Sequence, residues 1–198
     1  MSWLNVITVA LFVVWCLSEV AISTFSLVNR RRNRRAKVED RLSFLGMWLA
    51  LIVSVAFAMI AWQSRTTPAG LGDVGVLRRV LGWLGCACLA SGVAIRVAAA
   101  VTLRGQFTTT VTVATQQRIV DRGPYRHVRH PAYLGVLLSM LGFGLCSGSW
   151  ISWVVAVVLP LGAVVYRIRV EERALLRHFG GAYAEYSTRT SRLVPGVY

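Results

Sequence analysis

The feature that most constrains this chain is a series of apolar runs, each long enough to cross a lipid bilayer. A transmembrane helix needs about 20 predominantly apolar residues, and runs of at least that length cover residues 3–28, 42–62 and 76–103. Hydrophobic residues make up 56% of the 198-residue chain, above the ~45–50% of a soluble domain. Because the excess is concentrated in these runs, we expect lipid around them.

Two further apolar runs, residues 133–145 and 150–166, follow close together. Their short separation predicts a tight helical hairpin, with Pro160 kinking its returning arm. Residues 167–186 carry apolar side chains at helical spacing, and Gly180-Gly181 can divide them into two short helices. The fold class is therefore all-α integral membrane: about five transmembrane helices, the last two a hairpin, plus a cytoplasmic amphipathic C-terminal helix.

Basic residues set the expected orientation. The net charge is +14, and the densest block is residues 30–37. Lys and Arg mark the cytoplasmic ends of spans, whereas nucleic-acid binding would leave their position at the ends of apolar runs unexplained. Alternation then places the N-terminus outside, and residues 104–130 and the C-terminal helix inside, in what we expect to be a prokaryotic cell membrane.

Two ionisable residues and one polar segment do not fit simple spans. Glu19 lies within the first run, where it faces either the bundle interior or the interface, and Arg96 is deep enough in the third to face the interior. Residues 108–113 alternate like a strand, but in a membrane protein we expect an extended interfacial loop. The isolated C-x-C of Cys86 and Cys88 and the scattered histidines predict no metal site.

Polar and aromatic residues between positions 117 and 133 are candidates for chemistry. Pro131 suits the first turn of a helix, where free N–H groups can meet an anion such as a carboxylate. Tyr125 and Tyr133 offer flat faces and hydroxyls that suit an adenine ring and a ribose. The alternative is a basic, aromatic interfacial belt.

A second candidate group follows the last apolar run. Arg167 and Glu171 stand four residues apart and share a helix face. They form either a surface ion pair worth about 0.3–0.5 kcal/mol, or two separate contacts. In the second case Arg167 binds an anionic group of the substrate. Glu171 then accepts a hydrogen bond from a donor group of the cofactor, or lies near a cationic group of the cofactor. Glu172 is expected to face solvent or to cap locally.

Several motifs in this order and spacing resemble the isoprenylcysteine carboxyl methyltransferase family, which is related to the membrane phospholipid methyltransferases. They are Gly123-Pro124-Tyr125, residues 129–135, Glu171-Glu172, Phe179-Gly180, Tyr183, Tyr186 and residues 192–195. The resemblance covers residues 108–195 approximately, and the first two spans carry no motif. It implies S-adenosyl-L-methionine as cofactor, in a cytosolic pocket roofed by the C-terminal helix. It also implies one membrane domain, with N-terminal spans in 1–103 and a cofactor-binding methyltransferase core in 104–198.

The resemblance also assigns roles to residues. The cofactor-binding residues that it implies are Gln117, Arg118, Ile119, Val120, Tyr125, His130, Pro131, Ala132, Tyr133 and Glu171. Arg167 matches the family's substrate-side arginine, so Arg167 and Glu171 are the candidate catalytic residues. The family's Arg-x-Pro pattern near the end reads Arg189-Thr190-Ser191 here, so the path of the tail is not implied.

The expected acceptor is a lipophilic or lipidated molecule in contact with membrane lipids. An arginine favours a carboxylate, such as that of an isoprenylcysteine-like compound, over an amine. Two alternatives remain at this point. One is a membrane reductase of the sterol-reductase type that uses NADPH, and the other is a non-enzymatic lipid-binding protein.

Overall fold

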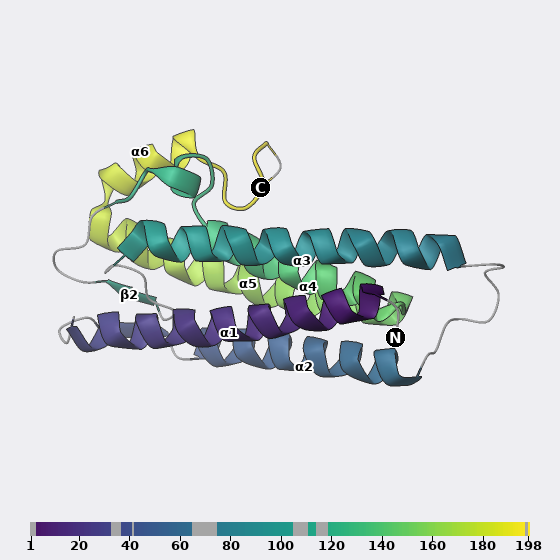
Figure 1. Ribbon diagram of the computed structural model, residues 1–198. Coiled ribbons are helices and arrows are strands. Elements are labelled where there is room, and N and C mark those ends of the chain that lie inside the picture. The colour runs from purple at the N-terminus through teal and green to yellow at the C-terminus, as the bar shows by residue number, and fades with distance from the viewer. Residues whose placement is uncertain are drawn as a thin grey trace.

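The computed structural model describes residues 3–32, 37–40, 42–64, 75–104, 111–113, 119–196 and 198. Five long helices lie side by side in one bundle (Figure 1). They are α1 (Trp3–Arg32), α2 (Leu42–Ser64), α3 (Gly75–Leu103), α4 (Pro131–Ser147) and α5 (Trp150–Phe179). The short helix α6 (Gly181–Arg189) and the 3-10 helix η2 (Gly123–Arg126) lie at one end of the bundle.

The outer surface of the bundle is apolar. The helices α1, α2, α3 and α5 are long and apolar enough to cross a membrane, and α4 is a shorter apolar helix. Large apolar side chains point outward from them, including Leu17, Leu49, Val101 and Val158. Lipid is the solvent that such a surface requires. The predicted all-α integral membrane fold is thereby confirmed.

The predicted hairpin of α4 and α5 is also confirmed. Gly148 ends α4 with a φ of 72°, and the Ser149 side chain caps α5 by accepting from the Ser152 N–H. The predicted boundary at residue 167 is wrong, because α5 runs through Pro160 without a break to Phe179. The change there from apolar to amphipathic sequence contains no helix breaker. The chain instead breaks at Gly180, where φ is 54°.

Glycines fix α4 against α3. Gly85 on α3 faces Gly142 on α4, and Gly92 faces Gly135. Along each helix the two glycines are seven residues apart, about two helical turns. A Cβ atom on Gly135 would lie 2.7 Å from the carbonyl oxygen of Gly92 and 2.8 Å from the Cβ of Arg96. Such small residues let helix backbones approach closely in membranes. This contact sets the depth and rotation of α4, including its first turn.

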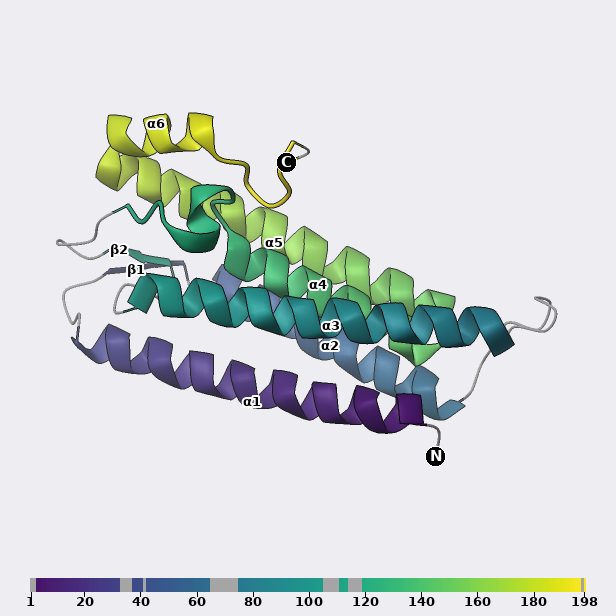
Figure 2. The same ribbon diagram turned by 45° about the horizontal axis from the view of Figure 1, so that its top comes forward.

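A small β-ladder joins two connecting segments. The strands β1 (Lys37–Asp40) and β2 (Val111–Val113) pair antiparallel, with Lys37 opposite Val113 (Figure 2). The expectation of an extended interfacial loop is therefore wrong for residues 111–113, which form a strand, while 108–110 lie outside the described residues. The strand partner β1 follows the basic block and was not predicted.

Both polar segments singled out in the sequence lie at the same end of the bundle. We call it the site end. There α1, α3 and α5 finish, α2 and α4 begin, and η2 and α6 pack (Figure 1). The N-terminus and the α4–α5 turn lie at the opposite, far end. The alternation of spans inferred from the charges predicts this grouping of the two polar segments.

Candidate functional site

The first turn of α4 is the framework of the site. Pro131 is the first helical residue, in the first turn as predicted, and His130 is the N-cap residue. The His130 carbonyl accepts from the backbone N–H groups of Tyr133 and Leu134, at 3.1 and 3.2 Å. The His130 N–H donates to the Arg192 carbonyl at 3.0 Å. The turn is therefore fixed on one side by its own helix and on the other by the C-terminal tail.

The tail extends this backbone contact. The Arg129 N–H donates to the Ser191 carbonyl at 2.8 Å, and the Ser191 N–H donates to the His127 carbonyl at 3.1 Å. Ser191 stands where the family pattern has a proline, which lacks an N–H and could not make the second bond. The departure from the pattern thus coincides with a backbone hydrogen bond between the tail and the segment before α4.

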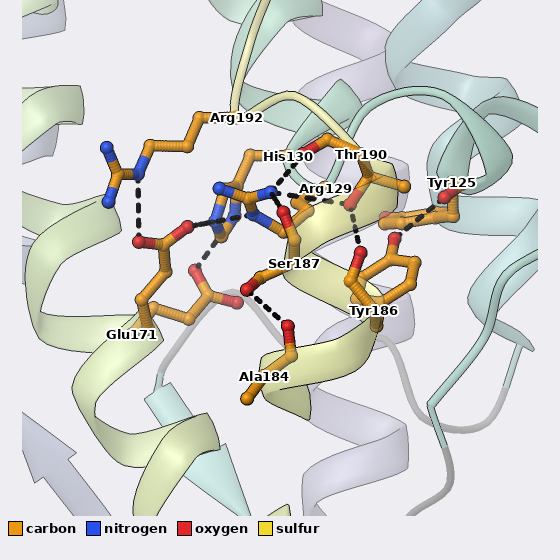
Figure 3. A network of polar contacts seen from close by, with 10 residues as sticks. Tyr125, Arg129, His130, Glu171, Ala184, Tyr186, Ser187, Thr190 and Arg192 are labelled. Atoms are coloured by element: carbon orange, nitrogen blue, oxygen red, sulfur yellow. Dashed lines mark hydrogen bonds and ion pairs between the residues drawn. The ribbon is translucent and has the colours of Figure 1, made fainter. Parts of the chain in front are cut away.

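A buried carboxylate holds the same region together. The Arg129 Nε donates to Oε1 of Glu172 at 3.0 Å, and the Arg192 Nε donates to Oε2 at 2.9 Å (Figure 3). Arg129 also donates through Nη1 to the Ser187 carbonyl at 2.7 Å and to the Thr190 carbonyl. Glu172 is buried. The expectation that it faces solvent is therefore wrong, because two arginines from outside its helix enclose it.

Arg167 and Glu171 are joined through a hydroxyl. The Arg167 Nε donates to the Tyr133 hydroxyl oxygen at 2.8 Å, and that hydroxyl donates to Oε2 of Glu171 at 2.9 Å. Arg167 Nη1 donates to the Ser43 hydroxyl at 2.9 Å. Arg167 is 1% exposed, whereas the Glu171 side chain is 31% exposed. These contacts are not a surface ion pair, and the two charges occupy different surroundings.

The His130 ring lies between the two glutamates. Its Nδ1 is 3.9 Å from Oε2 of Glu171, and its Nε2 is 3.5 Å from Oε1 of Glu172. The ring stacks on Tyr133, with centroids 5.7 Å apart and planes at 28°. Among the described residues, His130 Nε2 and the Tyr183 hydroxyl are buried without a hydrogen-bond partner. The Tyr183 hydroxyl is thus a buried polar atom that a ligand can engage, and His130 is held between the two carboxylates.

Tyrosines from α6 close the site from outside the bundle. The Tyr186 hydroxyl donates to the Tyr125 carbonyl at 2.7 Å. Burial raises the pKa of Tyr186 to about 12 although Arg129 lowers it, so the hydroxyl stays a donor at neutral pH. Burial, and then the negative charges of Glu172 and Glu171, raise the pKa of Tyr183. Its neutral hydroxyl therefore lies within electrostatic reach of both carboxylates.

The structure brings part of the predicted site together. His130, Tyr133, Arg167 and Glu171 form one cluster, and α6 ties Tyr125 to it. The other predicted positions lie nearby in sequence or outside the described residues. Pro131 and Ala132 are in the first turn of α4, Ile119 and Val120 are half-buried before η2, and Gln117 and Arg118 are not described.

Sequence reasoning assigned no binding role to the residues that hold this cluster in place. Glu172, Tyr183, Tyr186 and Arg192 belong to the motifs of the resemblance, and that membership was the available signal. No group of three His, Cys, Asp or Glu side chains that could hold a metal ion occurs in the described part of the chain.

Comparison with known proteins identifies the family of this chain. The model of the phospholipid methyltransferase family matches residues 80–182, more than half of the chain. The chain belongs to this family. The match begins in α3 and ends in α6, so α1 and α2 lie outside it. The related isoprenylcysteine methyltransferase resemblance is confirmed by named relatives.

Three relatives illustrate the range of the similarity. Protein-S-isoprenylcysteine O-methyltransferase of Dictyostelium discoideum is 29% identical over 60% of this chain and 51% of its own. Methanethiol S-methyltransferase of Mycobacterium tuberculosis is 28% identical over 73% and 61%. Delta(14)-sterol reductase of Mus musculus is 33% identical over 45% and 22%. The chain spans about half the length of the curated relatives it matches.

Proposed function

We propose that the protein is an S-adenosylmethionine-dependent membrane methyltransferase whose acceptor is a lipophilic carboxylate, such as an isoprenylcysteine-like compound. The observation that carries the proposal is the separation of charge across the Tyr133 hydroxyl. On one side is the buried Arg167 guanidinium, and on the other is the partly exposed Glu171 carboxylate. A cationic methyl donor and an anionic acceptor need these two opposite environments next to each other.

The residues present fit the methyl donor. Glu171 offers a carboxylate to hydroxyl or ammonium donors, and the buried Tyr183 hydroxyl makes no hydrogen bond within the described residues. The stacked rings of His130 and Tyr133 provide an aromatic wall. Tyr125 is held in place by Tyr186. When bound, S-adenosylmethionine supplies a methyl group already activated by a positive sulfonium.

The protein's part in the reaction is orientation and exclusion of water. The acceptor oxygen, the methyl carbon and the sulfur have to lie in line, with reacting atoms about 3–3.5 Å apart. Arg167 is rigidly held by Tyr133 and Ser43, and its guanidinium carbon lies 5.8 Å from the centre of the Phe44 ring. An arginine fixed in this way orients a carboxylate and offsets its desolvation. No residue has to abstract a proton when the acceptor is already a carboxylate.

The location of the site suits such an acceptor. Arg167 lies on α5, a helix long and apolar enough to cross a membrane. A lipid tail could remain in the membrane while its head group reaches Arg167. We also infer that the site end faces the cytosol, because the basic block of residues 30–37 follows α1 at that end.

A second candidate function is reduction with NADPH, favoured by the similarity to a sterol reductase. Calorimetry on the detergent-solubilised protein, with S-adenosylhomocysteine and with NADPH in separate titrations, distinguishes the two. We expect binding of S-adenosylhomocysteine alone. Binding of NADPH alone would overturn the methyltransferase proposal.

The acceptor is tested with radiolabelled S-adenosylmethionine. An isoprenylcysteine analogue with a free carboxylate is compared with the same compound as its carboxamide, and with a lipophilic thiol and amine. We expect label in the carboxylate compound and none in the carboxamide. Transfer only to the thiol, the acceptor class named for the mycobacterial relative, would contradict the carboxylate assignment.

A further inference from the structure

Glu19 of α1 and Arg96 of α3 form an ion pair inside the bundle. The two residues are 5% and 4% exposed. Arg96 donates from Nε to Oε1 of Glu19, and from Nη2 to Oε2 at 2.8 Å. This two-bond geometry fixes the plane of the guanidinium. Both residues face the bundle interior, which resolves the alternatives that the sequence left for Glu19.

Burying this ion pair inside the bundle costs free energy. Removing two charges from water carries a penalty of several kcal/mol per ion, and apolar residues of similar volume are often as stable or more so. The charge of Arg96 also lies near the first turn of α4, the positive end of that helix dipole. Stability alone therefore gives no reason for an arginine here, and ionisable residues within membrane helices commonly serve function.

Arg96 contacts the first two turns of α4. Its Nη1 donates to the carbonyl oxygen of Ala132 at 3.2 Å. Ala132 lies between His130 and Tyr133, whose side chains stack in the site. The backbone of Arg96 also abuts the next turn of α4, since a Cβ on Gly135 would lie 2.9 Å from the Arg96 nitrogen.

The charge of Arg96 also acts on Tyr125 of η2. Burial raises the pKa of the Tyr125 hydroxyl, with further contributions from Glu171 and Tyr133, and the positive charge of Arg96 acts in the opposite direction. Arg96 thus lies close enough to act on a tyrosine of η2 as well as on the backbone of α4.

We propose that Arg96, oriented by Glu19, is a positioning residue that fixes the first turn of α4 and so presents His130 and Tyr133 to the methyl donor. The inference rests on the proposed function for the identity of that ligand. Glu19 occupies two of the guanidinium's N–H directions, and the planar fork then directs a third at Ala132. The helix α1, which lies outside the family match, would in this way contribute to donor binding.

The test replaces the whole pair by apolar residues, in the double variant Glu19→Leu/Arg96→Met. This change leaves no unpaired charge, so the protein is expected to fold. We expect the dissociation constant of S-adenosylhomocysteine to rise about 3- to 10-fold, the effect of one hydrogen bond. Backbone amides of residues 132–135 should exchange hydrogen faster, while those at the far end of α4 stay unchanged.

A matched control removes a polar contact between the same two helices at the far end. The Thr8 hydroxyl lies 3.5 Å from the Cys86 sulfur, and Thr8→Val/Cys86→Ala should leave both affinity and exchange at residues 132–135 as in the parent. If the Glu19/Arg96 double variant also behaves like the parent, the pair only packs and the inference is overturned.

Two further results are informative. If the double variant fails to fold, Arg96→Lys is measured instead, because a lysine keeps the charge but lacks the planar fork that binds Glu19 and Ala132 together. Raised exchange and weaker affinity would support the inference, and parent-like values would overturn it. If the parent protein binds no S-adenosylhomocysteine, the proposed function fails, and hydrogen exchange at residues 132–135 alone decides the positioning role.

Discussion

Replacing Glu172 by glutamine should destabilise the protein far more than the loss of an ordinary surface charge. Glu172 is 12% exposed in its side chain and pairs with Arg129, which is 9% exposed, and with Arg192, which is 41% exposed. Removing one partner of a buried pair costs about 3–5 kcal/mol, because a charge is left uncompensated. The Arg192 pair is accessible to solvent and should add no more than about 1 kcal/mol.

Glutamine keeps one oxygen that can accept a hydrogen bond from Arg129. We therefore expect the free energy of unfolding to fall by an amount near the lower limit, about 3 kcal/mol. For a chain of this length each kcal/mol lowers the unfolding midpoint by roughly 2–4 °C. Thermal unfolding in detergent should therefore show a decrease of roughly 6–12 °C. The affinity for S-adenosylhomocysteine should fall as well, because Glu172 lies 3.5 Å from His130 Nε2.

The matched control is Glu185→Gln on α6. Glu185 pairs with Arg189 at 3.6 Å, but their side chains are 75% and 62% exposed. An exposed pair at this spacing contributes about 0.3–0.5 kcal/mol, so the midpoint should move by no more than about 2 °C. Equal shifts for the two variants would refute the reasoning that burial, rather than pairing, determines the cost.

Three other changes test separate parts of the site and the bundle. His130→Ala and Glu171→Ala should each weaken binding of S-adenosylhomocysteine by about tenfold or more in calorimetry, since each removes a polar contact in a buried site; unchanged affinity would place the donor elsewhere. Arg167→Ala should leave that affinity within a few-fold but lower kcat for a carboxylate acceptor by about a hundredfold, and retained turnover would exclude its substrate role. Gly135→Ala should destabilise the bundle by at least about 1–3 kcal/mol, because its Cβ would meet Gly92 and Arg96 within 3 Å, whereas Gly162→Ala, with nothing within 4 Å, should not.

The sequence predicted those parts of the fold that depend on short stretches of neighbouring residues. The four residues between two apolar runs predicted the hairpin, and Gly180 predicted the break before α6, because each depends on nearby chain chemistry. The end of α5 did not follow. The apolar character stops near residue 166 but the helix continues to Phe179, since hydropathy reports the surrounding solvent and not the backbone conformation.

The location of the site could be predicted from the sequence, but the hydrogen bonds and ion pairs between its residues could not. Charge alternation grouped the two polar segments at one end, and the resemblance named His130 and Glu171, which the structure brings within 3.9 Å. The burial of Glu172 and the hydroxyl of Tyr133 between two charges depend on partners 20–43 residues away. No local pattern reports such distant contacts, and the same holds for the pairing of β1 with β2.

The contact between Arg129 and the tail has a consequence for the order in which the protein is made. Arg129 and Thr190 are 61 residues apart, and at a synthesis rate of about 5–20 residues per second Thr190 is synthesised roughly 3–12 s after Arg129. By then all of α4 and α5 has been synthesised. Until the tail arrives, the Arg129 side chain has to remain among water or lipid head groups. Biosynthesis therefore completes the membrane bundle first and the site last.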